Sequence, residues 1–326
     1  MGRRMDNERD TKTALVSIVI VNFNGGDLLG ECVLAALSAT VPVEVILIDN
    51  GSSDGSMASL RTAIGTGARL RVVENGRNLG FAHACNQGLT YAMGKYVLLL
   101  NPDCVIQSHT LAQMIEAMEA HPHAGMAGSL IRNPDGTEQA GCRRAVPTPW
   151  RSLVRILHLN KLFPRHPQFQ TFLLNRRSAP AEPVFVEAIS GAFMLVRHGA
   201  IRDVGLLDEG YFLHCEDLDW CMRFSQAGWK ILFVPNVEVV HYKGRCSVNR
   251  PVFVEWHKHR GMVRFYRKYF RHRYPLPLLW LVEFAVWTRF LVLATQIGVR
   301  RIFSKWRTPI PAFGTGRHES NAKFRS

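Results

Sequence analysis

Residues 15–130 alternate between short apolar, β-branched runs and segments whose apolar residues recur at helical spacing. Such alternation is typical of crossover connections, in which each helix carries the chain back so that the next strand runs parallel to the last. The pattern therefore predicts an α/β fold with a mostly parallel central sheet and helices on both faces. Strands are expected at 15–21, 43–48, 70–73, 96–100 and 125–130, and helices at 28–37, 56–64, 81–93 and 110–120.

Two of the predicted strands are followed by an aspartate, Asp49 after the second strand and Asp103 after the fourth. Ligands of open α/β sheets bind outside the carboxyl ends of the strands, so two carboxylates there favour a polar site. Aspartate is also a common turn former, and one such residue alone would indicate only a turn. The second aspartate and a third acidic cluster, Glu216-Asp217, favour the site.

Two common nucleotide-binding signatures are missing from the sequence. The loop after the first strand reads N-F-N-G-G-D, which does not fit the dinucleotide fingerprint G-x-G-x-x-G, and the phosphate loop G-x-x-x-x-G-K-[ST] occurs nowhere. The sequence therefore argues against an NAD-dependent enzyme and against a P-loop NTPase.

The second half of the chain begins with an irregular stretch rich in Arg and Pro, residues 141–182, which we interpret as a long excursion able to act as a mobile loop over the site. Regular patterns then resume. Strands are predicted at 184–189, 192–196 and 230–234, helices at 218–226 and 251–270, and a last apolar stretch at 276–299.

The formal net charge of +14 is concentrated near the C-terminus, because residues 241–307 carry 15 Lys and Arg but only 2 Asp and Glu. Such a block binds nucleic acid or anionic lipid. Residues 264–271 interleave aromatic and cationic side chains, as single-strand binders do, but the adjacent apolar stretch favours a membrane surface, so no nucleic-acid partner is expected. Seven cysteines without a C-x-x-C pair, and a polar N-terminus without an apolar core, suit the cytoplasm.

The stretch 276–299 is long enough to span a bilayer, which needs about 20 residues. Glu283 and Arg289 interrupt it, and each charge near a helix centre costs about 2.5–3.5 kcal/mol. They lie about 240° apart around a helix and so cannot pair on one face. Basic residues also flank the stretch on both sides, Arg264, Arg267, Lys268, Arg271 and Arg273 before it, and Arg300, Arg301, Lys305 and Arg307 after it. We therefore expect a peripheral protein on the cytoplasmic face of the membrane, where anionic lipid attracts the cations.

Seven motifs occur in an order that resembles family 2 glycosyltransferases with the GT-A fold, and most of all the bacterial rhamnosyltransferase-like branch. They are V-S-I-V-I-V-N-F-N (16–24), I-D-N-G-S-S-D-G-S (48–56), N-L-G-F-A-H-A-C-N-Q-G (78–88), L-N-P-D (100–103), S-G-A-F-M-L-V-R (190–197), Y-F-L-H-C-E-D-L-D-W-C-M-R (211–223) and V-V-H-Y-K-G (239–244). The resemblance implies a GT-A domain at 15–250, with a Rossmann-like nucleotide-sugar half (15–130) and an acceptor half (131–250). A helical membrane-associating region (251–307) follows, between disordered ends at 1–14 and 308–326.

The resemblance also assigns residues that bind the nucleotide-diphosphate sugar. Asp49 would accept a hydrogen bond from the pyrimidine edge, because a carboxylate is an acceptor that matches an N–H donor. The other donor-binding positions implied are Asn22, Asn24, Asn78, Gly80, Asn101 and Asp103.

A divalent metal is implied at Asp103, which matches the last aspartate of the D-x-D motif of this fold. The first position here is Asn101, so the motif reads N-P-D and has lost one negative charge. His241 matches a histidine ligand of related enzymes, although a lone histidine ending a Val-rich strand is by itself more often structural. Oxygen and imidazole ligands suit Mg²⁺ or Mn²⁺.

Asp217 matches the general base of the family, with Glu216 and Arg223 as its expected supports, and the floor at Ser190 and Gly191 would lie on the acceptor side. The implied reaction is inverting transfer of a sugar, with L-rhamnose from dTDP-rhamnose as the candidate, to a glycan or polyprenyl-diphosphate-linked acceptor in cell-surface polysaccharide synthesis.

Two other readings remain open from the residues. A nucleotidyltransferase would need a basic loop after the first strand, which V-N-F-N-G-G-D lacks. A catalytically weak or inactive GT-A scaffold of a polysaccharide assembly complex is favoured by Asn101, whereas the acidic residues Asp103, Glu216 and Asp217 favour an enzyme.

Overall fold

The computed structural model describes residues 14–64, 69–163, 166–169, 172–176, 178–242, 244 and 250–306. The ends predicted to be disordered, 1–14 and 308–326, lie outside the described residues except for residue 14. The main-sheet strands are β1 (Val16–Asn22), β2 (Val43–Asp49), β3 (Leu70–Glu74), β4 (Tyr96–Leu100), β5 (Cys104–Val105), β6 (Ala124–Arg132), β8 (Val184–Val186), β10 (Phe193–Arg197) and β11 (Lys230–His241).

These strands form a nine-stranded sheet in the order β3-β2-β1-β4-β10-β6-β11-β5, with β8 pairing with β11. Strands β1 to β4 pair in parallel, and so do β6 and β11. Strand β10 runs antiparallel between β4 and β6, and β5 and β8 run antiparallel to β11. The prediction of a mostly parallel sheet is confirmed.

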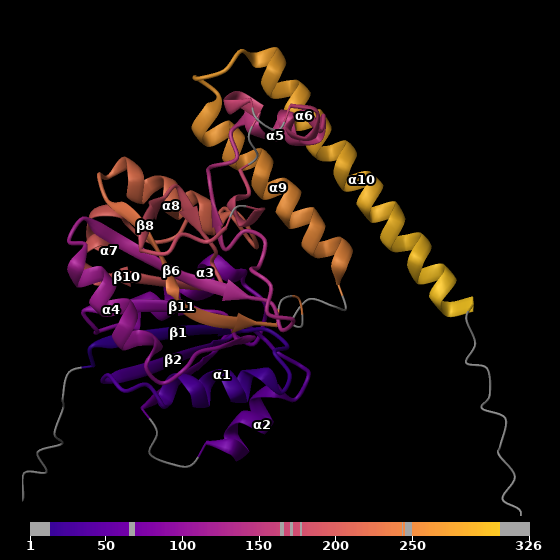
Figure 1. The fold of residues 1–326 in the computed structure, drawn as a ribbon. Helices are drawn as coiled ribbons and strands as arrows, with labels where there is room; N and C mark the ends of the chain where they lie inside the picture. The colour runs from indigo at the N-terminus through magenta and orange to yellow at the C-terminus, as the bar shows by residue number, and fades with distance from the viewer. Residues whose placement is uncertain are drawn as a thin grey trace, which may run out of the picture.

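Helices cover both faces of the sheet because its strands are apolar on both sides (Figure 1). In β1, Ile18 and Ile20 join one core with α1 (Leu28–Leu37), α2 (Ser56–Ala63) and α4 (Thr110–Ala120), while Val19 and Val21 face the opposite core. That second core contains α3 (Phe81–Tyr91), α7 (His198–Val204), α8 (Glu216–Gln226) and α9 (Pro251–Phe270).

The interpretation of 141–182 as irregular was wrong for most of the part that the structure describes, whereas its mobility stays a prediction. It contains β7 (Arg143–Arg144), which pairs with β9 (Ala188–Ile189), the helices α5 (Pro149–Ile156) and α6 (Leu159–Leu162), and two 3-10 turns, η1 (Pro167–Phe169) and η2 (Leu174–Arg176). Thr148 caps α5 by accepting a hydrogen bond from the backbone N–H of Arg151 at 3.2 Å, and Pro149 occupies its first turn. Helix α5 contacts α9, because Ser152 Oγ lies 2.6 Å from the hydroxyl of Tyr266 in α9.

Glu187 explains why the predicted strand 184–189 is divided into β8 and β9. Its carboxylate accepts a hydrogen bond from the backbone N–H of Val146 at 2.7 Å and pairs with Arg151 at the same distance. The side chain thus joins the two strands to α5 rather than continuing a sheet ladder.

The last described element is a single long helix, α10 (Leu276–Trp306), which leaves the body of the molecule alongside α9 (Figure 1). By length and composition, Leu276–Ile302 is able to cross a membrane, and 17% of its most apolar window is buried. From the sequence, only a pairing of Glu283 with Arg289 was considered, but Arg267 of α9 donates two hydrogen bonds to Glu283, at 2.8 and 2.6 Å. A helical wheel of one segment cannot reveal a partner on another helix.

Close packing of α3 on β1 makes Gly88 a sensitive position. A Cβ there would lie 2.2 Å from Cγ1 of the buried Val19, whereas a Cβ at Gly30 of α1 would meet nothing within 4 Å. We expect Gly88→Ala to lower the free energy of unfolding by about 1–3 kcal/mol. Gly30→Ala should leave it unchanged or raise it by up to about 1 kcal/mol. Urea denaturation of both variants checks this, and equal midpoints would contradict the packing.

Candidate active site

The carboxyl ends of β1 and β2 place Asn22 and Asp49 side by side, because the two residues are register partners. Asn22 is fully buried, and its amide donates a 2.9 Å hydrogen bond to Asp49 Oδ1. The backbone N–H of Ser52 donates to Asp49 Oδ2 at 3.1 Å. Asn24, with φ of 57°, accepts from the backbone N–H of Ser53 at 2.8 Å. These residues form one polar wall at the strand ends, in which Asp49 retains unused lone pairs.

A second amide cluster, centred on Asn50, connects this wall to Asn78 and Gly80. The Asn50 amide donates to Asn78 Oδ1 at 3.0 Å and to the carbonyl of Gly80 at 3.3 Å. Gly80 has φ of 95°, and a Cβ there would lie 3.0 Å from Phe212, so glycine is required. Sequence reasoning missed Asn50, although the motif I-D-N-G-S-S-D-G-S contains it.

The corner between β5 and β11 brings Asp103 and His241 together. His241 is the register partner of Cys104, and its Nε2 lies 3.0 Å from Asp103 Oδ1, with both side chains buried. That contact lacks hydrogen-bond geometry, because Oδ1 has no hydrogen-bond partner among the described residues. The donor atoms of Asp103, Cys104 and His241 lie within 4.8 Å of one another. A buried carboxylate oxygen without a proton donor, facing an imidazole nitrogen, fits a divalent cation.

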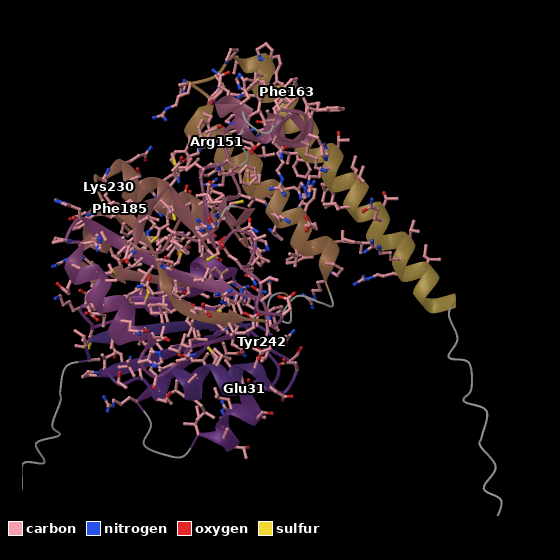
Figure 2. All side chains as sticks on the ribbon, in the orientation of Figure 1. Glu31, Arg151, Phe163, Phe185, Lys230 and Tyr242 are labelled. Carbon is pink, nitrogen blue, oxygen red and sulfur yellow. The ribbon has the colours of Figure 1, made fainter. Side chains whose placement is uncertain are left out.

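Asn101 lies next to this corner, its amide nitrogen 3.5 Å from His241 Nε2. Its backbone N–H donates to the carbonyl of Ala192 at 3.0 Å, because β10 runs antiparallel beside β4. Ser190 and Gly191 directly precede Ala192, so the small-residue floor is continuous with the metal corner. Tyr242, the residue after His241, lies at the side of the body toward which β6 and β11 point (Figure 2).

Asp217 lies against this floor, at the start of α8. Its Oδ2 accepts a 3.1 Å hydrogen bond from the backbone N–H of Gly191 and forms an ion pair with Arg144. Its Oδ1 accepts a hydrogen bond from the backbone N–H of Leu218 at 2.8 Å. Burial is the largest influence on the pKa of Arg144 and lowers it, but the charge and hydrogen bond of Asp217, together with the nearby Cys221 and Cys215, raise that pKa overall. Sequence reasoning missed Arg144, which belongs to the segment interpreted as a loop.

The turn before α8 is strained. His214 and Cys215 adopt φ of 67° and 72°, a region that side chains other than glycine rarely occupy. Helix α9 presses on this turn at Gly261, where a Cβ would lie 2.9 Å from the carbonyl oxygen of His214. Such strain persists only where the surroundings impose it, and here it directs Glu216 and Asp217 toward the sheet.

Glu216 is buried and keeps its proton at neutral pH. Burial raises its pKa to about 8, with a further contribution from the charge of Asp217. Its Oε2 has no hydrogen-bond partner among the residues that the structure describes.

The expected support of Asp217 by Arg223 is wrong, because Arg223 donates to Asp219 at 2.9 Å instead. Asp219 is fully buried and also accepts from Lys268 at 2.6 Å and from the hydroxyl of Tyr269 at 2.9 Å. Asp219 and Arg223 therefore anchor α8 to α9 rather than serving the site.

These observations can be set against known proteins. Residues 17–182 match the family described as glycosyl transferase family 2, which is more than half of the chain. The chain belongs to this family. The expected activity, that of a glycosyltransferase, is thereby confirmed, and the nucleotidyltransferase reading loses its support.

Two similar proteins are rhamnosyltransferases, in agreement with the branch that the motifs indicated. N-acetylglucosaminyl-diphospho-decaprenol L-rhamnosyltransferase of Mycobacterium tuberculosis is 29% identical over 319 residues, which cover 94% of this chain and 100% of that protein. Rhamnosyltransferase WbbL of Escherichia coli K12 is 28% identical over 174 residues, covering 50% of this chain and 61% of its own length.

Solved structures confirm the GT-A fold of this glycosyltransferase. The mannosyltransferase PcManGT from Pyrobaculum calidifontis, in complex with GDP-Man and Mn²⁺, superposes with a TM-score of 0.55 at 18% identity, over 83% of this chain and 68% of that one. GalNAc-T7 with UDP, GalNAc and Mn²⁺ gives 0.53 at 22% identity, over 71% and 44%.

The buried Glu216 predicts a pH dependence of stability. Because its pKa is raised from 4.5 in an unfolded chain to about 8, the folded enzyme binds one more proton between these values, and stability falls as pH rises through this window. Glu216→Gln, which is neutral at all pH values, should match the wild type near pH 4 and be more stable at pH 8 by at least about 1 kcal/mol.

Urea unfolding at both pH values measures this effect. Glu31→Gln on the exposed surface of α1, at the opposite end of the molecule from α10 (Figure 2), is the control and should show no such difference. A Glu216→Gln variant with the same advantage at pH 4 and pH 8 would argue against a protonated Glu216.

Proposed function

We propose that this enzyme transfers L-rhamnose from a nucleotide-diphosphate donor, dTDP-rhamnose, to an N-acetylglucosaminyl-diphospho-polyprenol acceptor, with inversion at the anomeric carbon. The specificity is suggested by the Mycobacterium tuberculosis relative, whose name states this sugar and acceptor and whose whole length is covered. The observation that carries the chemistry is the continuous path from Asn101 through Ala192 and Gly191 to Asp217, which sets a carboxylate beside the metal corner.

In this proposal Asp217 is the general base. Each carboxylate oxygen has two lone pairs. Those of Oδ2 are taken by Gly191 and Arg144, whereas Oδ1 has one donor among the described residues, the Leu218 N–H, and keeps a lone pair for the acceptor hydroxyl. Arg144 and Gly191 therefore orient the carboxylate, and the neutral Glu216 beside it avoids a second negative charge. Single displacement needs one base and no carboxylate nucleophile.

The donor would bind along the strand ends, with its nucleoside at Asn22 and Asp49 and its diphosphate toward Asn101 and Asp103. Asp103 and His241 would hold Mg²⁺ or Mn²⁺, which stabilises the departing diphosphate when bound. Asp103 and His241 supply one carboxylate and one imidazole, so the diphosphate oxygens would complete the ligand set of a cation that prefers oxygen.

Removal of the base tests this assignment. We expect Asp217→Asn to reduce transfer by about 10²–10⁴, the usual contribution of general acid–base catalysis, with donor affinity within about threefold of wild type. Rates are measured with dTDP-rhamnose and a soluble N-acetylglucosaminyl-diphosphate lipid analogue, with NMR of the product anomer. Asp203→Asn, on the exposed surface of α7, is the matched control and should retain full activity. Near-normal turnover by Asp217→Asn would exclude it as the base.

We further propose that α10 lies on the cytoplasmic surface of the membrane with the lipid-linked acceptor beside it. The face of α10 opposite α9 exposes large apolar side chains, among them Trp280 (65% exposed), Phe284 (70%) and Leu291 (62%). Phe163, which directly follows α6, is also exposed (53%) and is labelled in Figure 2, and the preceding helix α5 packs on α10. A continuous exposed apolar surface normally marks a contact with a membrane or with another protein.

The inner face of α10 supports a surface position rather than a span. Trp287 packs against Trp256 of α9 at 5.0 Å between ring centroids, and Glu283 is bound to Arg267. If α10 spanned the membrane, the half of the helix that packs on α9 would have to separate from the body of the protein. Fewer cations are left for lipid than the sequence suggested, because Arg264, Arg267 and Lys268 pair within the protein; Arg271, Arg273 and Arg300 lie exposed.

Single charges on the outer face test this arrangement without disturbing the core. Phe284→Glu and Leu291→Glu should each reduce co-sedimentation with vesicles containing phosphatidylglycerol at least about tenfold, since an apolar anchor is replaced by a charge that anionic lipid repels. Leu34→Glu on α1, which is 46% exposed, is the control and should bind as wild type. Carbonate should release the wild-type protein from membranes. Retention after carbonate, with the C-terminus accessible to protease on the far side, would mean that α10 spans the bilayer.

A further inference from the structure

A line of hydrogen bonds ends on His241, at the ring nitrogen that faces away from Asp103. His241 Nδ1 lies 2.7 Å from Oε1 of Gln139, a side chain that is 4% exposed. Gln139 Nε2 donates to Asn133 Oδ1 at 2.9 Å and to the backbone carbonyl of His241 at 3.4 Å. None of these contacts involves the donor-binding residues assigned above.

The direction of every proton in this line is fixed from its two ends. A backbone carbonyl only accepts, so the nitrogen of the Gln139 amide must face the His241 carbonyl, and its oxygen must face the ring. From the other end, the carboxylate of Asp135 accepts the hydroxyl proton of Thr137 at 2.6 Å, so the Thr137 oxygen accepts from Asn133 Nδ2 at 3.0 Å. Asn133 Oδ1 is then the atom that faces Gln139, and both ends give the same orientation.

This orientation determines which ring nitrogen of His241 carries the proton. Because Gln139 presents an acceptor, Nδ1 must be the donor, and the neutral ring then has its lone pair on Nε2. Nε2 is the atom 3.0 Å from Asp103 Oδ1, so two electron-pair donors face each other in a buried corner. A cation can be bound between two such electron-pair donors, whereas a hydrogen bond between them would need a proton on one of the two atoms.

We infer that Gln139 is a positioning residue for metal binding, which holds His241 in the tautomer and ring orientation that present Nε2 to a divalent cation beside Asp103. The inference rests on the proposed metal site and adds to it a residue that never touches the metal. Such partners of ligating histidines fix the ring and raise ligand basicity, and their loss typically costs about 10–100-fold in metal affinity.

Binding of Mn²⁺ alone, followed by the EPR signal of the free ion, tests the inference on the whole chain. Gln139→Leu removes the acceptor and should weaken Mn²⁺ binding about 10–100-fold. Gln139→Glu retains an acceptor for Nδ1 and should weaken Mn²⁺ binding less than Gln139→Leu, although its second oxygen faces Asn133 Oδ1 and the His241 carbonyl. Gln113→Leu on the exposed face of α4 is the control and should bind Mn²⁺ as the wild type does. If Gln139→Leu does not fold, Gln139→Met, which also lacks the acceptor, is measured in its place.

A second readout does not depend on metal. In protein labelled with ¹⁵N-histidine, the resonances of His241, assigned by their loss in His241→Ala, should show a protonated Nδ1 and an unprotonated Nε2. In Gln139→Leu they should shift toward the other tautomer, whereas Gln139→Glu should restore the wild-type pattern.

The outcomes separate the inference from the function on which it rests. Wild-type Mn²⁺ affinity and unchanged His241 resonances in Gln139→Leu would overturn the role of Gln139, while a loss of affinity in His241→Ala would leave the metal site standing. Unchanged affinity in His241→Ala would remove His241 from the metal site, and the inference would fall with it.

Discussion

Strand β10 runs against its neighbours, and the arrangement of the site depends on this antiparallel insertion between β4 and β6. A parallel strand would deliver its beginning to the opposite edge of the sheet. The antiparallel strand instead begins where β4 ends, so that Ala192 bonds to Asn101 and Gly191 meets Asp217. The β10 ladder with β4 and β6, and the Asn101–Ala192 hydrogen bond at its end, thereby join the parallel strands to the segment that meets Asp217.

The sequence was sufficient to predict most strands of the main sheet and the polar residues at strand ends, because the spacing of apolar residues along the chain is a local property. Asp49 and Asp103 stand out after buried strands, and the motifs place His241 and Asp217 by resemblance. Arg144 and Gln139 were not predicted, since their partners lie 73 and 102 residues away in the chain. Helix α5 was missed despite a visible start signal, Thr148-Pro149, because the surrounding Arg and Pro residues obscure its short apolar pattern.

Charge is another property that the sequence alone misrepresents. The basic block contributes most of the net charge, yet Lys268 lies between the carboxylates of Asp208 and Asp219, and Arg264 also pairs with Asp208. The aromatic residues between them, Phe265, Tyr266 and Phe270, are buried. The alternation of aromatic and basic residues at 264–271 thus reflects a helix with one face in the core and one on acidic partners.

Helix α9 contacts both the turn that carries the proposed base, Asp217, and the helix α10 that is proposed to lie on the membrane. Near its middle, Gly261 supports the strained turn before Asp217, and Trp256 packs on the helix proposed to lie on the membrane. Gly261 and Trp256 lie five residues apart on this one helix, about 7.5 Å along its axis, so the turn before Asp217 and the packed half of α10 keep a constant separation. If α10 lies on the membrane surface, the height of the active site above the lipid is therefore constant. Acceptors would then be sorted by how far their sugar stands from the bilayer, in addition to the chemistry of the sugar itself.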